Sequence, residues 1–542
     1  MPTYLTPGVY VEEVSSGSKP IEGVVTSVAA FIGVAERGPV NKPVSITKPD
    51  DFEVTFGGYL PPGTGTETNS TGGTKHKSYL SHAVTQFFNH GGSRCYVVRI
   101  SKGAASATSP DTGLLTNVKA AYEETKARNP LSPGEDTWNP GQWANDHYDV
   151  HITQSKSDPT HLFDLTVRYW KTPSERGLPE DRWEDRPVIK ESYVDLSHWP
   201  DSRTFAPNVV NEASRLVSIE IDPARIAADA ATVHGLADEE TYVLSSGDDG
   251  SEVNSSSDGH IFDDALHSLD TIEDVRLIAI PGIPEQARAG VEYCDNRPQR
   301  DCVFFMDPPE NDKRPSDIID WSGRPENSTS SSFGVLYYPW IEADNFGPKG
   351  GTAWFPPSAF VMGMCGRIDQ RRGIWKAPAG LGTPLVVKRV KYELTGREQG
   401  SLNQLGINCL RVIKGTGTVI WGARTRSTFA DPEWRYLPVR RTAIMIERSI
   451  YGGIQWAVFE PNDHRLWSAL RANVENFMDG LFRVGAFQGE KASDAYFVHC
   501  GLGDTMTQGE IDAGQVIVEV GFSPLKPAEF VIVRIQQKVN QM

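Results

Sequence analysis

The C-terminal region of the chain opens with Arg441-Thr-Ala-Ile-Met-Ile-Glu-Arg-Ser-Ile450 and continues through Gln455-Trp-Ala-Val-Phe-Glu-Pro-Asn462. The first stretch is apolar and rich in isoleucine, which favours a strand. A helix is predicted after Asn462 or Asp463, because either residue can cap an N-terminus and apolar residues then recur at helical spacing. We expect one buried face of this helix to carry Leu466, Leu470, Val474, Phe477 and Leu481.

Further strands are predicted beyond this helix, at Tyr496–Cys500, Gln515–Phe522 and Glu529–Gln536, with a proline-bounded turn at Ser523–Pro527 before the last one. A strand rich in Val and Ile has open hydrogen-bonding edges, which proteins either cover or use to pair with another chain. Pairing with another chain is the favoured interpretation here. This C-terminal arm comprises Phe530, Val531, Ile532, Val533, Arg534 and Ile535.

An alternating segment, Gly8–Val14, lies among prolines and glycines near the N-terminus. As a strand it would place Val9 and Val11 on one side and Tyr10 and Glu12 on the other. A strand this short does not stand alone. The residues themselves leave two roles open: pairing within its own fold, or serving as an arm that adds to a neighbour's sheet.

Several of these stretches, in this order, resemble the C-terminal domain and N-terminal signature of the tail sheath proteins of contractile phage tails and related bacterial injection systems. The motifs are Thr6-Pro-Gly-Val-Tyr-Val-Glu-Glu13, Glu191-Ser-Tyr-Val-Asp-Leu-Ser-His-Trp-Pro-Asp-Ser-Arg203, Val209-Val-Asn-Glu-Ala-Ser-Arg-Leu-Val217, Trp421-Gly-Ala-Arg-Thr425, Ile446-Glu-Arg-Ser-Ile450, Gln455–Asn462, Leu466-Trp467, Gly485-Ala486, Ile511-Asp-Ala-Gly514 and Pro527-Ala-Glu-Phe-Val-Ile-Val-Arg-Ile-Gln536. The resemblance favours the arm role for Val9, Tyr10, Val11, Glu12 and Val14.

The resemblance implies a structural subunit that forms stacked hexameric rings around an inner tube and contracts to drive that tube through a target membrane. Its partners would be further copies of itself, the inner tube protein, and baseplate and terminator proteins. Rigid domains would turn during contraction while the terminal arms keep subunits joined. Glycines at the roots of the arms are the hinge candidates, and replacing them with proline should block contraction but not folding. They are Gly17, Gly23, Gly514 and Gly521.

Length and composition bound these interpretations. A chain of 542 residues is long enough for three or four domains. Its net charge of −17 argues against nucleic acid or an anionic membrane as a partner. This charge is interpreted either as simple solubility or as repulsion that restrains assembly without a template. The six cysteines are far apart, with no CxxC pair, and are expected as buried reduced thiols.

No run approaches the length of a membrane span, and no signal segment is evident at the N-terminus. The protein is therefore expected in the cytoplasm of the producing bacterium, as part of a phage tail or tail-like particle that lysis can release. Neither direct membrane insertion nor nucleic-acid binding is expected.

We predict a multidomain protein of α/β and α+β class. Strand–helix–strand patterns before residue 101 and after residue 272 indicate one discontinuous, largely parallel α/β core. The family resemblance implies a non-catalytic core similar to the subtilisin fold. The predicted parts are an N-terminal arm (1–23), the core domain (24–101 with 261–385), a β-rich, Trp-containing outer insertion with an acidic linker (102–260), an α+β C-terminal sheath domain (386–525) and a C-terminal arm (526–542).

No established catalytic motif is present: HExxH, GxSxG, GxxxxGK[ST] and a correctly placed GxGxxG are all missing from the sequence. Asp307, which follows a predicted strand with Asp301 nearby, is the strongest catalytic candidate, because ligands gather at the carboxyl edge of parallel sheets. Asp307-Pro-Pro-Glu310 is also an ordinary strand-ending turn, which is the favoured interpretation. No enzyme activity, cofactor or metal site is therefore predicted. A cytosolic α/β hydrolase with a decorated insertion is the alternative.

Two other features have open interpretations. Arg367 with Gln370-Arg-Arg-Gly373, and Arg435 with Arg440 and Arg441, form local basic clusters. They are expected to be solvated faces, or else contacts to acidic surfaces of a neighbouring subunit or the inner tube. The tryptophans of residues 102–225 could form a surface-binding module for carbohydrate, or simply a core.

Overall fold

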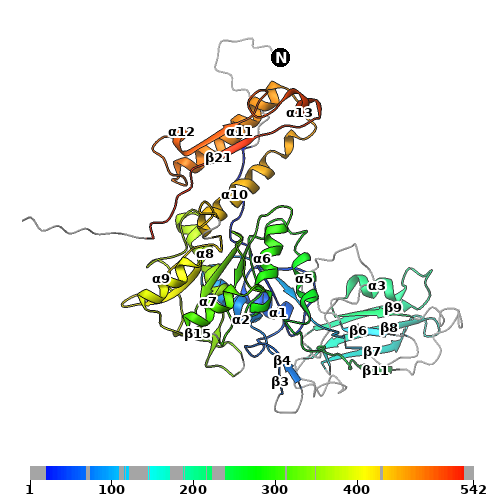
Figure 1. Ribbon diagram of the computed structural model, residues 1–542. Helices are drawn as coiled ribbons and strands as arrows, with labels where there is room; N and C mark the ends of the chain where they lie inside the picture. The colour runs from blue at the N-terminus through cyan, green and yellow to red at the C-terminus, as the bar shows by residue number, and fades with distance from the viewer. Residues whose placement is uncertain are drawn as a thin grey trace, which may run out of the picture. The chain divides into compact units, whose positions relative to one another are not determined.

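Figure 1 shows the computed structural model of the chain, which contains two compact units. The main unit comprises residues 26–371 and 377–437, and the C-terminal unit comprises the segments before 26, from 372 to 376 and after 437. The structure describes residues 20–68, 74–105, 107–108, 115, 117–120, 144–145, 147–170, 187, 189–214, 216–221, 239–311, 314–347, 349–427 and 431–529.

An eight-stranded, mostly parallel sheet forms the centre of the main unit, in the order β19-β18-β14-β13-β12-β1-β5-β2. The strands are β1 (Ala29–Gly33), β2 (Val44–Ile46), β5 (Cys95–Arg99), β12 (Leu277–Ala279), β13 (Val303–Met306), β14 (Gly334–Tyr338), β18 (Ile407–Ile413) and β19 (Gly417–Ile420). Only the outer strands β2 and β19 pair antiparallel. Strands β13 and β14 are buried along their whole length, which explains their continuous apolar sequences. The predicted parallel core is confirmed.

Helices alternate with these strands. They are α1 (Pro49–Phe56), α2 (Leu80–Asn89), α5 (Gly259–His267), α6 (Ala287–Asn296), α7 (Pro315–Gly323), α8 (Ser358–Arg372) and α9 (Gly396–Gln404). Local signals set several of their starts: α9 begins with a capping box in which Thr395 and Glu398 bond each other's backbone N–H groups.

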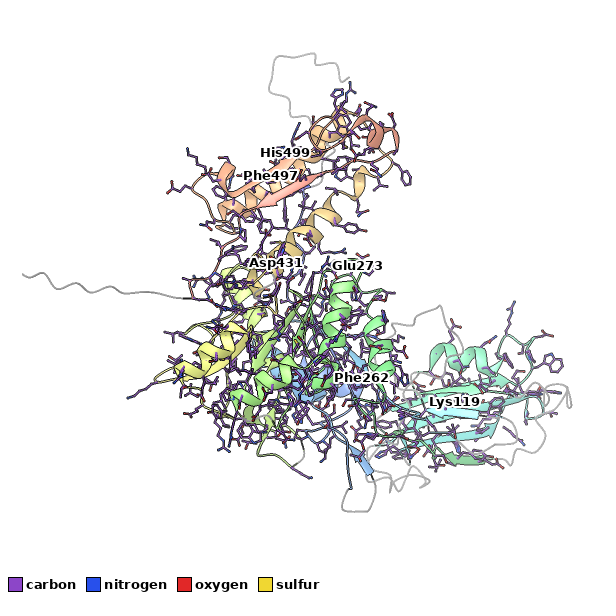
Figure 2. The ribbon with its side chains drawn as sticks, viewed as in Figure 1. Lys119, Phe262, Glu273, Asp431, Phe497 and His499 are labelled. Atoms are coloured by element: carbon purple, nitrogen blue, oxygen red, sulfur yellow. The ribbon has the colours of Figure 1, made fainter. Side chains whose placement is uncertain are left out.

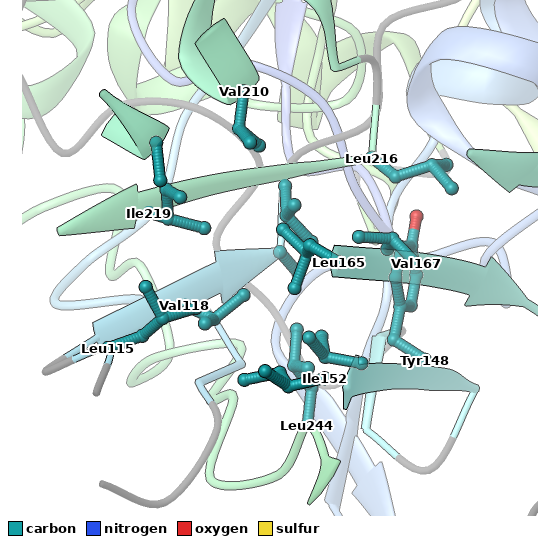
Figure 3. Packing of buried hydrophobic residues seen from close by; sticks show 14 of the residues in the cluster. Leu115, Val118, Tyr148, Ile152, Leu165, Val167, Val210, Leu216, Ile219 and Leu244 are labelled. Carbon is teal, nitrogen blue, oxygen red and sulfur yellow. The ribbon is translucent and has the colours of Figure 1, made fainter. Parts of the chain in front are cut away.

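The described residues between 107 and 244 add a second, β-rich core to the main unit. A four-stranded antiparallel sheet, β11-β7-β8-β9, and a pair, β10-β6, contribute to it. The elements are β6 (Asn117–Ala120), β7 (Tyr148–Gln154), β8 (Leu162–Tyr169), β9 (Ile189–Ser197), α3 (Ala206–Ala213), β10 (Val217–Glu220) and β11 (Glu239–Val243). Figure 3 shows Leu165, Val167 and Tyr148 packing with Ile219 and Val210. Strands β7 and β8 belong to the part of the chain predicted to be a β-rich insertion.

The main unit extends further along the chain than predicted. Strand β18 pairs in parallel with β14, and the segment containing β17 (Arg389–Val390), α9, β18 and β19 belongs to this unit. We had expected residues 386–437 in the C-terminal domain, so that part of the boundary is corrected. Strands β18 and β19 form an antiparallel hairpin. Smaller sheets comprise β3 (Thr66–Thr68) with β4 (Thr74–His76), and β16 (Thr352–Phe355) with β15 (Ile341–Asp344) and β17.

The C-terminal unit packs two long helices against a two-stranded sheet. Its elements are α10 (Leu437–Gly453), η5 (Gln455–Ala457), α11 (His464–Arg483), α12 (Ala492–Ala495), β20 (Tyr496–His499), α13 (Gln508–Asp512) and β21 (Glu519–Phe522). The prediction of a strand over 441–450 is wrong, because these residues lie within α10. Met445 and Ile446 enter the core there, so tertiary burial outweighs the β preference of isoleucine.

All six cysteines are unpaired and buried, as expected. Burial raises the pKa of the Cys95 thiol, which keeps it protonated. Among the described residues, no helix is both long and apolar enough to cross a membrane.

Candidate assembly interface

The sheet of the C-terminal unit is the clearest candidate for an interaction site. Strands β20 and β21 pair antiparallel, with Phe497 opposite Gly521 and His499 opposite Glu519. The alternate residues of both strands pack on the core that α10 and α11 share, and they are Tyr496, Val498, Val520 and Phe522. A sheet of only two strands is marginally stable and normally gains further strands or a cover.

Both outer edges of this sheet offer free backbone groups. The Ser523 N–H donates to the Ala495 carbonyl at 2.7 Å, so these two residues form a hydrogen-bonded pair next to the sheet. This bond shows which of the following pairs are hydrogen-bonded and which are not. In an antiparallel pair, every second residue then directs its N–H and C=O away from the partner. These residues are Val520 and Phe522 on β21, and Tyr496 and Val498 on β20. The Tyr496 N–H donates to the Ala492 carbonyl at the end of α12. Within the described ranges, no backbone hydrogen bond reaches the outward groups of Val498, Val520 or Phe522.

The outward face of the sheet is partly aromatic and partly anionic. Figure 2 labels Phe497 and His499 on this face, and their ring centroids are 5.1 Å apart. Phe497 is 46% exposed, and exposed Leu502 and Ile517 follow beyond the paired residues. Glu519 is exposed beside them. An added β-strand would pair the free backbone groups of this edge and cover its exposed apolar side chains.

His499 is already engaged by a neighbouring carboxylate. Its Nδ1 lies 3.2 Å from Oδ2 of Asp504, in the loop that follows β20. Glu519, opposite His499, has no ion-pair partner among the residues that the structure describes. Glu519 therefore adds an exposed carboxylate to the β21 side of the sheet.

The predicted helix face lies where expected. Leu466, Leu470 and Val474 on α11 are buried, and Phe477 and Leu481 are partly buried against the same cluster. Asp463, not Asn462, caps the helix by accepting from the N–H groups of Arg465 and Leu466. This bonding lowers the pKa of the Asp463 carboxyl.

The predicted arms and one hinge glycine fall outside the described residues, so the structure does not place them. They are Val9, Tyr10, Val11, Glu12, Val14, Gly17, Phe530, Val531, Ile532, Val533, Arg534 and Ile535.

The other hinge candidates differ in their surroundings. Gly23 lies between Ile21 and Val24, which both contact the core of the C-terminal unit. Gly514 follows α13 with a φ of +78°, a conformation that glycine adopts without strain. Gly521 lies within β21, where a Cβ atom would be 2.2 Å from Cε1 of Phe497. Packing against Phe497 therefore requires glycine at position 521 whether or not this position is a hinge.

Asp307, the catalytic candidate, is held inside the main unit. The carboxylate accepts hydrogen bonds from Ser358 Oγ (2.7 Å), Ser358 N–H (3.0 Å) and Gly282 N–H (3.2 Å). Its side chain is buried, which raises its pKa to about 7 despite these donors. The contacts join the ends of two strands to the start of α8. With no nucleophile–base arrangement around it, Asp307 has a structural role here.

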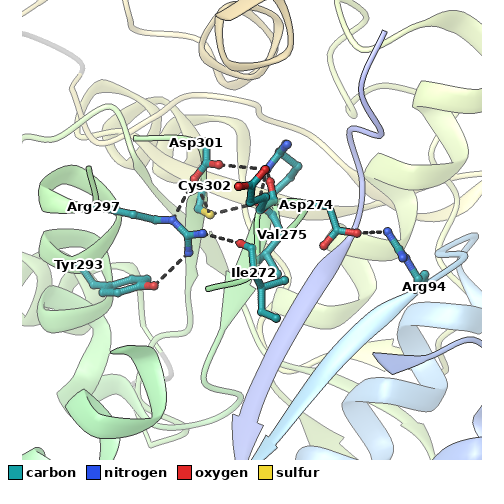
Figure 4. Close-up of polar contacts among 10 residues, drawn as sticks. Arg94, Ile272, Asp274, Val275, Tyr293, Arg297, Asp301 and Cys302 are labelled. Atoms are coloured by element: carbon teal, nitrogen blue, oxygen red, sulfur yellow. Dashed lines mark hydrogen bonds and ion pairs between the residues drawn. The ribbon is translucent and has the colours of Figure 1, made fainter. Parts of the chain in front are cut away.

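A second buried carboxylate, Asp301, was not predicted to form ion pairs. Figure 4 shows it beside Arg297, whose Nε is 3.0 Å from Oδ1 of Asp301. On its other oxygen, Arg276 Nη1 is 3.2 Å from Oδ2. Asp301 is fully buried, and burial raises the pKa of the adjacent Cys302 thiol. Among the described residues, no group of side chains could hold a metal ion.

The basic clusters also differ from expectation. Arg440 and Arg441 are only 8% and 3% exposed on α10, so the solvated-face prediction is wrong for them. Arg371 and Arg372 at the end of α8 are exposed, as expected, and Arg367 is half-buried. Among the tryptophans of the insertion, Trp170 is buried and donates from Nε1 to Asp149.

The main unit is thus an α/β core, and the C-terminal unit has a two-stranded sheet with open edges. Comparison with protein families identifies both parts. Residues 262–426 match the phage tail sheath protein central domain, and residues 430–538 match the phage tail sheath C-terminal domain.

The tail sheath protein of Vibrio phage KVP40 is 22% identical over 254 residues, which cover 43% of this chain and 36% of that protein. Among solved structures, the contracted PVC sheath of an extracellular contractile injection system has a TM-score of 0.56 at 22% identity, over 99% of both chains. The contracted helical sheath of the anti-feeding prophage has a TM-score of 0.55 at 22% identity, over 99% of this chain and all of that one.

The chain therefore belongs to the phage tail sheath protein family. Its match spans about a third of the length of the relative from Vibrio phage KVP40.

Proposed function

We propose that this subunit forms stacked hexameric rings around an inner tube and that its terminal arms join the rings by strand exchange. Residues 9–14 of one copy and 530–535 of another would add to the β20–β21 sheet of a third. The observation that supports this proposal is the pair of open edges, where Val498 on one side and Val520 and Phe522 on the other direct their backbone groups outward.

Contraction is a change of lattice rather than a chemical reaction. The extended sheath is kinetically trapped until a baseplate signal releases it, and rigid domains then turn into a shorter, wider arrangement. Main-chain hydrogen bonds to the arms keep the subunits joined during this change. The free energy released by each subunit sums along the sheath and drives the tube through a target membrane.

The net charge of −17 supports a restraint on assembly. Like-charged subunits repel one another in solution, so the inner tube and baseplate act as the template that brings them together. A terminator protein would close the far end. The subunit is made in the cytoplasm of the producing bacterium and leaves it, on lysis, within the particle. The similarity of its core to the subtilisin fold, implied by the family, stays a prediction.

A surface-binding role for the insertion stays open as a second candidate for residues 102–225 alone. Its exposed strand β9 presents Val194, which is 67% exposed, on the outside of the four-stranded sheet.

Negative-stain electron microscopy tests strand exchange. The full chain should form striated tubes, alone or with its inner tube and baseplate. Deleting residues 1–19 removes the N-terminal arm and leaves Ile21, which packs in the core of the C-terminal unit, in place. Deleting residues 530–542 removes the C-terminal arm. Each deletion should leave soluble monomers with native circular dichroism, and tubes from either variant as regular as those of the full chain would refute the proposal.

A further inference from the structure

Residues 383–388 of the main unit, called the strap below, run from the edge of the eight-stranded sheet to the three-stranded sheet. The Leu385 N–H donates to a carbonyl of β19 at 2.8 Å, and the Lys388 N–H donates to a carbonyl of β15 at 2.7 Å. Between these two anchors, the side chain of Val386 is 74% exposed, so burial does not hold it. The middle of the strap is therefore held through its backbone.

A histidine makes that backbone contact. The Val386 N–H donates to Nε2 of His90, at the C-terminal end of α2, over 3.1 Å. Because a backbone N–H is always a donor, Nε2 must present its lone pair. The proton of the neutral ring then lies on Nδ1, which is 2.8 Å from the Gln86 carbonyl and donates to it. Both ring nitrogens are therefore matched only while His90 is neutral.

The surroundings of His90 favour the neutral ring. The side chain is fully buried, and its ring lies against that of Phe360 on α8, with centroids 5.0 Å apart. Burial lowers the pKa of His90, its backbone hydrogen bond opposes this, and the positive charge of Arg367 on α8 lowers the pKa further. Lys388, the charged residue of the strap, is paired with Asp344 at 3.1 Å. Acid is therefore needed to charge the ring.

We propose that His90 is an acid-sensitive switch that fastens the middle of the strap to α2. When Nε2 takes up a proton, the ring presents an N–H to the Val386 N–H, and the hydrogen bond is lost. The strap then opens between its anchors at Leu385 and Lys388, which bond to carbonyl groups and do not titrate. The contact is complete above about pH 6.5 and weakens as the pH falls, because the open form binds a proton that the closed form excludes.

Hydrogen–deuterium exchange of the full-length protein, read by mass spectrometry, tests this switch. Rates at pH 7 and pH 5 are compared after correction for the intrinsic pH dependence of amide exchange. Exchange in peptides that contain Val386 should rise by up to about tenfold for each pH unit below 6.5, the ordinary pKa of histidine. Peptides from β18 and β19 should not change over this interval.

Two variants separate the hydrogen bond from the titration. His90→Gln places an amide oxygen near the position of Nε2, so it can accept from the Val386 N–H but binds no proton in this range. It should exchange slowly at both pH values. His82→Gln is the matched control, because His82 is buried on the same helix but its Nε2 lies 3.2 Å from the Leu60 carbonyl. This control should keep the acid response of the strap.

The outcomes are distinct. Exchange at Val386 that does not rise in acid would overturn the switch. An acid response that persists in His90→Gln, or that disappears in His82→Gln, would overturn the assignment to His90. Equal acid-induced exchange in the peptides of β18 and β19 would show unfolding of the whole unit in place of a local opening. That last comparison needs only the wild-type protein and holds even where a variant does not fold.

Discussion

Gly290 on α6 lies against the ring of Phe304 on β13, and a Cβ atom at position 290 would be only 2.2 Å from Cε2 of that ring. Phe304 is 2% exposed and has no free space to enter. We expect Gly290→Ala to displace the ring or the helix and to lower the free energy of unfolding by about 1–2 kcal/mol, after the gain in helix propensity. Urea unfolding followed by tryptophan fluorescence measures this.

Gly400 in α9 provides the matched control for Gly290. A Cβ atom there would have no neighbour within 4 Å. Gly400→Ala should therefore stabilise the protein by about 0.5–1 kcal/mol, because alanine loses less backbone entropy in a helix. Equal effects at the two positions would show that the contact with Phe304 is not what requires glycine.

Asp307 should make stability depend on pH. Burial raises the pKa of its carboxyl from 3.8 to about 7, so the folded protein binds a proton that the unfolded chain has already released between those values. This contribution to stability is present below about pH 4 and is lost as the pH rises through 7. Asp307→Asn keeps an oxygen for the Ser358 N–H and removes the titration.

The measurement is the urea midpoint of both proteins at pH 5 and pH 8. Wild type should lose more stability than Asp307→Asn over this interval. Ser358→Ala serves as the companion variant, because the Ser358 hydroxyl lowers the pKa of Asp307, and its removal should raise that pKa further and extend the loss of stability to higher pH. Identical pH profiles for wild type and Asp307→Asn would contradict the assignment.

The buried ion group around Asp301 should be costly to break. Asp301→Ala leaves the guanidinium groups of Arg276 and Arg297 without their carboxylate, and losing one partner of a buried pair typically costs about 3–5 kcal/mol. The exposed pair of Arg288 with Glu292 on α6 is the control, because Glu292→Ala should change stability by less than about 0.5 kcal/mol. Thermal unfolding compares the two, and similar shifts would contradict a structural role for the buried group.

The parts of the fold that follow from local sequence could be predicted. Apolar runs such as Val303–Met306 and helix starts such as the Asp463 cap depend on neighbours along the chain, and so does the repeat that places Leu470 and Val474 in the core. The strand prediction for residues 441–450 is wrong because their isoleucines favour a strand locally. Only packing against the core of the C-terminal unit makes the segment helical.

Other features depend on contacts that sequence spacing does not show. The pairing of β18 with β14 joins Ile407 to Leu336, and only that pairing assigns the hairpin to the main unit. The outward face at Phe497 was missed because Tyr496-Phe-Val-His499 is apolar or aromatic at most positions, so alternation does not indicate the buried side. The ion-pair partners of Asp301 are Arg276 and Arg297, which lie on different parts of the chain. The sequence singled out Asp301 but did not indicate these partners.

Gly23 and Gly514 should respond differently to substitution, which sharpens the test of the hinge proposal. A Cβ atom at Gly23 meets nothing within 4 Å, and its φ is not positive, so Gly23→Pro should fold normally and, if the arm turns there, block contraction. Gly514 has a φ of +78° and donates its N–H to the Ile511 carbonyl, so proline would disrupt folding at that position. Gly514→Ala is the usable variant and should lower the free energy of unfolding by about 1–2 kcal/mol from strain alone.

Electron microscopy of assembled particles after triggering shows whether each variant contracts. Gly23→Pro particles that contract to the wild-type length would exclude Gly23 as a hinge.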